Sequence, residues 1–123
     1  MNPTPTDKQE FYGPLTPAMF HVLLALAGED MHGYAILKEV ELRTAGEVKL
    51  STGTLYGIIK RLLSDGLIEE LRQRPAAGED DERRRYYRLS RQGRAVAQAE
   101  AERLEKVVVL ARSRNLLRKP RTA

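Results

Sequence analysis

The chain has 123 residues and a mass of 13.9 kDa, which corresponds to one small domain. It has no Cys, so disulfide scaffolds, cysteine nucleophiles and thiolate metal sites are excluded. Its charge is divided unevenly. Residues 1–58 hold four Lys or Arg and seven Asp or Glu, whereas residues 59–123 hold seventeen and ten. A basic half on a small domain favours a polyanionic partner such as nucleic acid, although charge also serves solubility.

The first predicted elements are an arm and two helices. Residues 1–14 are rich in Pro and polar side chains, which predicts a flexible N-terminal arm. A buried helix is predicted over residues 17–27, because they are apolar nearly all round and Thr16 can cap them. A second helix, with one apolar stripe, is predicted over residues 33–44.

The third predicted helix covers residues 52–65, with Ser51 as its N-cap and Gly66 just after its end. Apolar side chains recur on one face at the helical spacing: Leu55, Ile58, Ile59 and Leu62. The opposite face carries small, hydroxyl-bearing and basic side chains: Gly53, Thr54, Tyr56, Gly57, Lys60, Arg61 and Ser64.

This polar face is typical of a helix that enters the major groove of DNA. Small side chains allow close approach, hydroxyls bond phosphates or base edges, and Arg binds guanine through two hydrogen bonds. The helix N-terminus also attracts a phosphate. The alternative is an ordinary solvated helix face. That alternative leaves Gly57 unexplained, because Gly within a helix costs about 1 kcal/mol relative to Ala.

A two-stranded hairpin is predicted next, from residues 67–71 and 85–89, with a long charged connection between them. Helices followed by such a hairpin form the winged helix-turn-helix plan, with the hairpin as the wing. We expect the arginines at its base to contact the DNA backbone or minor groove: Arg72, Arg74, Arg83, Arg84 and Arg85. Their alternative role is to neutralise the acidic run at residues 79–82.

The last predicted helix runs from about Ser90 to Arg112 and carries an apolar seam for another helix. The seam consists of Ala97, Ala101, Leu104, Val107, Val108 and Ala111. It can pack on a second copy of the chain, which predicts a homodimer, or back on the helix at residues 17–27. Both kinds of packing are possible, on different faces of this helix. Residues 113–123 are a basic tail.

No enzyme motif is present: the sequence has no P-loop, nucleophile elbow or dinucleotide fingerprint. His21 and His32 lie in different predicted elements, His21 near the core and His32 at a helix start, so no metal site is expected. No apolar run approaches the roughly 18 residues that span a membrane, and the apolar stretch at residues 20–27 lacks a basic region before it. We therefore expect a cytoplasmic protein without cofactor, metal or membrane contact.

Several motifs together resemble the PadR family of bacterial transcriptional regulators. They are HGY at 32–34, LSTGTLY at 50–56, KRL at 60–62, DGLIE at 65–69, RYYRLS at 85–90 and Gly93. The resemblance covers residues 15–112, and the single helix after the wing is similar to the compact subgroup. It implies a mainly α fold, a winged helix with a small β-hairpin. It divides the chain into an arm (1–14), a DNA-binding domain (15–89), a dimerisation helix (90–112) and a tail (113–123).

The resemblance further implies a homodimeric repressor that binds double-stranded DNA at a pseudo-palindromic operator. It places Ser51 and Thr52 in the recognition region beside the polar helix face, and it adds Tyr34 as a phosphate contact or packing residue. Some compact members bind a small-molecule inducer, a flat aromatic compound, between stacked Trp residues. This chain has no Trp, so that binding mode is not carried over. The alternative function is a winged helix that binds a protein and no DNA.

Overall fold

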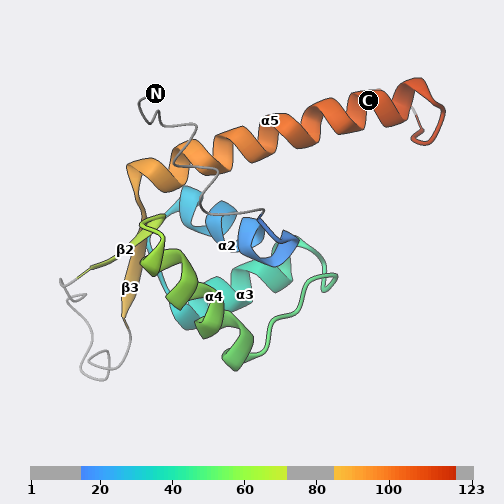
Figure 1. Cartoon of the computed structure of the whole chain (residues 1–123). Coiled ribbons are helices and arrows are strands. Elements are labelled where there is room, and N and C mark those ends of the chain that lie inside the picture. Colours follow the sequence, from blue (N-terminus) through green and yellow to red (C-terminus); the bar gives the residue numbers. More distant parts are fainter. Residues whose placement is uncertain (1–14, 72–84, 119–123) are drawn as a thin grey trace, which may run out of the picture.

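The computed structural model describes residues 15–71 and 85–118 (Figure 1). Helices dominate, with one small sheet and a long C-terminal helix, as the sequence predicted. The elements in chain order are α2 (Pro17–Gly28), β1 (Met31–His32), α3 (Gly33–Arg43), α4 (Thr52–Ser64), β2 (Ile68–Leu71), β3 (Tyr86–Leu89) and α5 (Arg91–Ser113).

Hydroxyl side chains fix the starts of three helices. Thr16, Ser51 and Ser90 precede α2, α4 and α5, and each accepts the backbone N–H three residues further on at 2.9–3.1 Å. Such a cap satisfies one of the backbone donors that a helix start leaves unpaired. Gly66 follows α4 with φ of +76°, a conformation that favours glycine. The predicted helix boundaries are confirmed to within one residue at each end.

The sheet differs from the predicted two-stranded hairpin, because it has three antiparallel strands in the order β1-β3-β2. Met31 pairs with Tyr87 and His32 pairs with Tyr86, on the free side of β3. A two-residue strand is too short to show an alternating pattern, so the sequence carried no signal for it. As predicted, His32 stands at a helix start: its Nδ1 atom accepts the N–H of Ala35 at 3.2 Å and caps α3.

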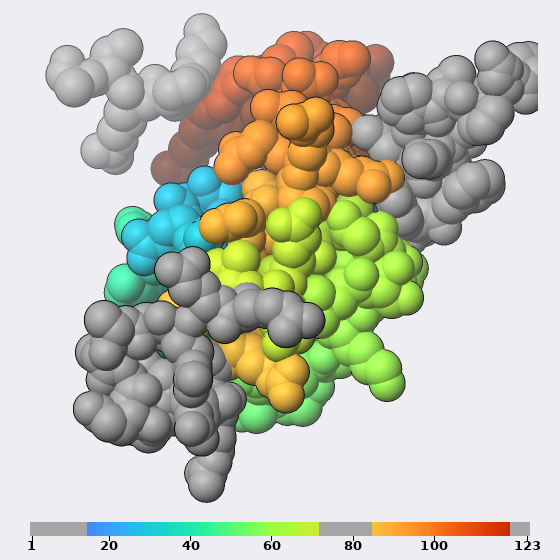
Figure 2. All heavy atoms as spheres, turned by 90° about the vertical axis from the view of Figure 1, so that its left-hand side faces the viewer, coloured from blue at the N-terminus to red at the C-terminus, as the bar shows by residue number. Residues whose placement is uncertain are grey.

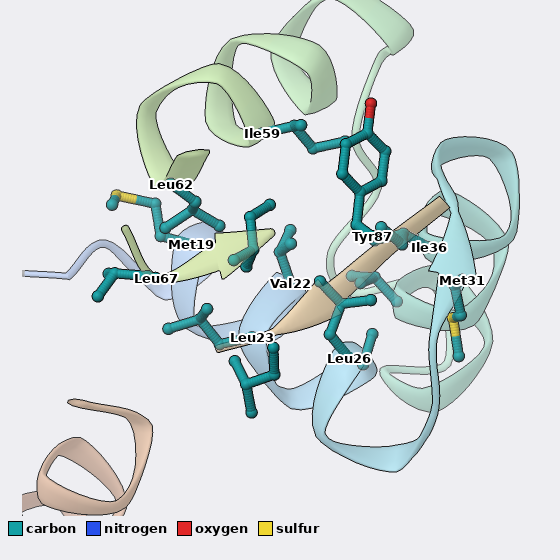
Figure 3. Close-up of a cluster of buried hydrophobic side chains, with 14 of the residues drawn as sticks. Met19, Val22, Leu23, Leu26, Met31, Ile36, Ile59, Leu62, Leu67 and Tyr87 are labelled. Atoms are coloured by element: carbon teal, nitrogen blue, oxygen red, sulfur yellow. The ribbon is translucent and has the colours of Figure 1, made fainter. Parts of the chain in front are cut away.

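The core lies where α2, α3 and α4 meet the sheet, and Figure 3 shows its side chains converging from these elements. Leu55, Ile59 and Leu62 from α4 are buried and Ile58 is partly buried against the core, which confirms that the predicted apolar face packs inward. Leu67, at the start of the wing, is also fully buried. This packing fixes the direction of α4 and turns its polar face toward solvent.

The junction of β3 with α5 is closely packed. Ser90 donates its hydroxyl proton to the carbonyl oxygen of Gly66 at 2.7 Å, and its N–H bonds the carbonyl of Leu67 at 3.0 Å. A Cβ atom on Gly93 would collide with the carbonyl oxygen of Leu67, so this position requires glycine. These contacts fix the angle at which α5 leaves the sheet.

The first turns of α5 pack on α2 (Figures 1 and 2). The helix then runs past the rest of the molecule (Figure 1). Val96 and Ala97 are buried among the core side chains. Ala97 thus packs against α2 of its own protomer, which is the alternative predicted for the seam, and its place in a dimer interface stays a prediction. The sequence left this open, since the same helical face serves the core first and solvent later.

Candidate nucleic-acid interface

The face of α4 that points away from the core is exposed along its whole length. It begins at the N-cap and covers more than three helical turns. All nine of its predicted DNA-binding residues are classed as exposed: Ser51, Thr52, Gly53, Thr54, Tyr56, Gly57, Lys60, Arg61 and Ser64. The structure therefore brings these residues together on one accessible surface, which we call the α4 face.

Two glycines keep the α4 face shallow. A Cβ atom built on Gly53 or Gly57 would meet nothing within 4 Å. The packing of this chain therefore does not require glycine at either position. Because Ala is more favourable than Gly within a helix, a surface that another molecule approaches closely is the remaining physical reason for Gly57.

The N-terminal turn of α4 is ordered by Ser51. Its hydroxyl oxygen accepts the N–H of Thr54 at 3.1 Å, and the hydroxyl donates to Oγ1 of Thr54 at 3.0 Å. The positive end of the helix dipole is thereby fixed and exposed. Such an end attracts a phosphate group.

Two adjacent cations occupy the second half of the α4 face. The Nε atom of Arg61 lies 3.1 Å from Oδ2 of Asp65, one turn further along the helix. This pair, at the i,i+4 spacing that sequence can reveal, orients the guanidinium along the surface. Within residues 15–71 and 85–118, Lys60 has no ion-pair partner, so its charge is not neutralised there.

Tyr56 has a second role that the sequence did not indicate. It remains 46% exposed, yet its hydroxyl lies against Gly33, the first residue of α3, where a Cβ atom would collide with it. Tyr56 therefore braces α4 against α3 while one side of its ring faces solvent. No periodicity could have revealed this contact, because it joins two different helices.

Tyr34 lies on α3 and is 57% exposed. The ring of His32 stacks near it at 6.5 Å between centroids and meets the edge of Tyr86 at 5.2 Å. The Lys38 amine lies 5.4 Å from the centre of the Tyr34 ring. A hydroxyl and a cation are thus presented together at the start of α3, and each is a group that can contact a phosphate.

The wing is described only at its base. Arg85 is exposed and donates from Nη1 to Oε2 of Glu70 at 2.8 Å, across β2 and β3. The other four predicted arginines and the acidic run at 79–82 lie outside the described residues: Arg72, Arg74, Arg83 and Arg84. Arg85 is thus the one predicted wing residue that the structure places.

A cavity of about 370 Å³ separates α4 from the base of the wing. Lys60 lines it from α4, and Glu70, Arg85 and Tyr87 line it from the strands. Figure 3 shows the Tyr87 hydroxyl directed past Ile59, away from the core cluster. Burial raises the pKa of Tyr87, and the negative charge of Glu70 raises it further, so its hydroxyl stays a neutral hydrogen-bond donor.

The distal half of α5 presents an apolar row to solvent. Leu104, Val107 and Val108 are 36%, 48% and 39% exposed, Ala101 is exposed and Ala111 is half-buried. The row continues the face that buries Ala97, but beyond the point where the core ends. A contiguous exposed apolar surface of this kind marks an interaction site.

Other kinds of site find no support in the part of the chain that the structure describes. Its His, Asp and Glu side chains form no group of three able to hold a metal ion. None of its helices combines the length and apolar character that crossing a bilayer requires.

The comparisons with known proteins identify the family. The sequence model of the transcriptional regulator PadR-like family matches residues 22–99. The chain belongs to this family. The PadR resemblance inferred from the sequence motifs is thereby confirmed. No curated protein matches the chain significantly.

Solved structures agree with the PadR-like assignment. A transcriptional regulator from Clostridium thermocellum shares 26% identity at a TM-score of 0.64, over 77% of this chain and 86% of its own. A PadR family transcription regulator from Clostridium difficile shares 24% identity at a TM-score of 0.64, and the match covers 77% of this chain and 94% of that protein. RosR of H. salinarum shares 23% identity at a TM-score of 0.59, and the match covers 85% of this chain and 98% of RosR. Below 25% identity the likeness establishes the fold alone. The chain thus has the fold of a PadR-like transcriptional regulator, and the matched proteins are regulators.

Proposed function

We propose that the protein is a sequence-specific, homodimeric transcriptional repressor that reads a pseudo-palindromic operator. The single observation that carries this proposal is the α4 face, where a capped helix presents hydroxyls, two cations and two glycines beside a wing. In a family of transcriptional regulators, double-stranded DNA is the ligand that such a face fits best.

In the proposed complex, α4 lies in the major groove with its N-terminal half deepest. Gly53 and Gly57 let the helix backbone approach the base edges, because none of the described residues fills the space beside them. Arg61 binds guanine through paired hydrogen bonds. The hydroxyls of Thr52, Thr54 and Ser64 bond phosphates or base edges, and the N-terminus at Ser51 holds a phosphate.

The remaining contacts of the proposed complex are to the backbone. Tyr34 and Lys60 flank the α4 contacts and reach phosphates. Arg85 approaches from the wing together with Arg72, Arg74, Arg83 and Arg84, which contact the backbone or the minor groove. Such contacts fix the position of the protein on the duplex without reading its sequence.

The second protomer joins through α5. Ala101, Leu104, Val107, Val108 and Ala111 of the two chains pack together, which removes their apolar surface from water. A two-fold dimer then reads two half-sites about one helical turn apart, or a multiple of it. Bound across a promoter in the cytoplasm of a bacterium, the dimer excludes RNA polymerase and represses the gene.

Selection of genomic fragments tests this function. The purified protein is incubated with fragmented DNA of its source near physiological salt, and the bound pieces are recovered and sequenced. We expect a few intergenic fragments that share an inverted repeat. A Lys60→Ala, Arg61→Ala double variant serves as the control and should lose this enrichment. Uniform or absent recovery by the unmodified protein would contradict the proposal and would favour the protein-binding alternative.

A further inference from the structure

The cavity between α4 and the base of the wing needs no second protomer, because α4 and the strands of one chain line it. Its volume of about 370 Å³ lies within the range of small-molecule sites, roughly 300–1,000 Å³. Ile59 and Leu63 line it from α4, and both pack on the hydrophobic core. The cavity therefore has an apolar wall against which the carbon skeleton of a small molecule can lie.

Tyr87 presents a buried hydroxyl to this cavity. The residue is only 4% exposed, and Figure 3 shows its hydroxyl directed past Ile59, away from the core cluster. In the part of the chain that the structure describes, this hydroxyl makes no hydrogen bond. A polar group on a side chain buried to this degree normally has a partner. Because the pKa of Tyr87 is raised, the hydroxyl keeps its proton and can donate it to a bound acceptor.

The charged groups of the cavity favour a ligand with one negative charge. Arg85 and Glu70 pair with each other at 2.8 Å, so their charges largely cancel. Lys60 has no ion-pair partner among the described residues, which leaves one uncompensated positive charge in the lining.

The type of anion follows from the same groups. A phosphate monoester carries nearly two negative charges near neutral pH, and the carboxylate of Glu70 would repel the second. A carboxylate carries a single charge, and its two oxygens can accept hydrogen bonds from two donors. The Lys60 amine and the Tyr87 hydroxyl are two such donors in one cavity.

We propose that this cavity binds a small organic monocarboxylate with an apolar body, and that the bound molecule displaces DNA. The carboxylate lies between the Lys60 amine and the Tyr87 hydroxyl, and the apolar body lies against Ile59 and Leu63. Lys60 and Arg85 line the cavity and are also proposed phosphate contacts, so the ligand and the operator compete for them. The displacement rests on the proposed function, whereas ligand binding does not.

Octanoate is the probe for ligand binding. Octanol and octyl phosphate serve as comparison compounds, because they carry the same alkyl chain with no charge and with nearly two charges. Each compound is titrated into isotope-labelled protein, and binding is followed through the backbone amide signals of α4, β2 and β3. We expect octanoate to bind at least about tenfold more tightly than either comparison compound. Equal or tighter binding of octanol or octyl phosphate would overturn the assignment of a carboxylate.

Tyr87→Phe locates the bound carboxylate. The variant keeps the ring that packs in the core and removes only the hydroxyl, so octanoate binding should weaken about tenfold as a hydrogen bond to a charged group is lost. Tyr86→Phe is the matched control, because Tyr86 is the neighbouring residue of β3 and does not line the cavity. Neither tyrosine is a proposed DNA contact, so both variants should keep their affinity for the operator. Unchanged octanoate binding by Tyr87→Phe would overturn the site.

Competition with DNA tests the displacement. Fluorescence anisotropy on a recovered operator fragment gives the dissociation constant with and without octanoate. At ten times its own dissociation constant, octanoate should raise that of the operator at least about tenfold, because only the unoccupied protein binds DNA. Acetate at the same concentration controls for ionic strength and should have far less effect.

The outcomes separate the two proposals. If octanoate binds but weakens operator binding no more than acetate does, the displacement is overturned and the repressor stands. If the protein binds no DNA, the proposed function and the displacement both fail, and the octanoate titrations alone support or overturn the carboxylate site.

Discussion

The helices α4 and α5 are both amphipathic, but they differ in what the protomer leaves uncovered. On α4 the apolar face is buried at Leu55, Ile59 and Leu62 and partly buried at Ile58, and the exposed face is polar, basic and shallow. On α5 the apolar face is buried only as far as Ala97, and its continuation at Leu104 and Val107 meets solvent. An exposed basic face can bind a polyanion, whereas an exposed apolar face can pack against another apolar surface. The two faces thus divide DNA binding and assembly between two ends of one small chain.

Truncating one leucine on each helix separates these roles and gives the largest effect. Leu62→Ala on α4 should lower the free energy of unfolding by about 3 kcal/mol, because Leu62 is fully buried and its removal leaves a cavity. Leu104→Ala on α5 should change protomer stability by less than about 0.5 kcal/mol, since Leu104 lies beyond the core. It should instead weaken the dimer. Urea unfolding of dilute protein and sedimentation velocity measure the two quantities. If Leu62→Ala and Leu104→Ala lowered protomer stability equally, the proposed difference between the apolar faces of α4 and α5 would be contradicted.

Arg61→Ala addresses sequence reading by α4. Operator binding should weaken by about 2 kcal/mol, because a paired contact to guanine is lost, while binding to random duplex changes less. Arg103→Ala is the control, since Arg103 lies on α5 and pairs with Glu100. Fluorescence anisotropy on both duplexes gives the comparison. If operator and random DNA weakened equally, Arg61 would be a phosphate contact.

Gly57→Ala tests whether the shallow surface serves a ligand. The variant should stabilise the free protein by up to about 1 kcal/mol, because Ala suits a helix better and a Cβ atom meets nothing there. Operator binding should weaken, since the added methyl group holds the helix away from the groove. Gly28→Ala, at the end of α2 and also in open space, should leave operator binding unchanged. Unchanged binding by Gly57→Ala as well would contradict close approach.

The smallest effect concerns pH and lies on α5. The hydrogen bond from Arg103 lowers the pKa of Glu100, so the pair stabilises the helix above the ordinary carboxyl pKa. That contribution is lost as pH falls through the lowered pKa of the folded state. The pair is exposed, so the effect is slight. Thermal unfolding of Glu100→Gln and the unmodified protein should differ near neutral pH and converge as the pH falls below the lowered pKa of Glu100 in the folded state. A difference that grew on acidification would contradict this assignment.

The sequence predicted what depends on local periodicity and capping. The buried face of α4 and the caps at Thr16, Ser51 and Ser90 follow from spacing and side-chain chemistry, and the structure confirms them. The ion pair of Arg61 with Asp65 also follows from spacing alone.

Contacts between distant segments could not be predicted in the same way. The strand β1 exists only because Met31 and His32 lie along β3, and two residues have no period. The contact of Tyr56 with Gly33 joins two helices, and neither residue signals the other. Ala97 lies on the predicted apolar row, but only the packed structure shows where α2 stops covering it. The assignments of DNA-binding and dimer residues stay predictions.

The stoichiometry of the operator complex tests most directly whether α4 binds DNA while α5 joins the two protomers. Sedimentation equilibrium of the protein with a duplex carrying one recovered inverted repeat, near physiological salt, gives the number of protomers bound. If α4 binds DNA and α5 joins the protomers, two protomers bind each duplex, and one protomer or none binds when a single half-site remains. A complex of one protomer with the full repeat, at the same affinity as with a half-site, would contradict it.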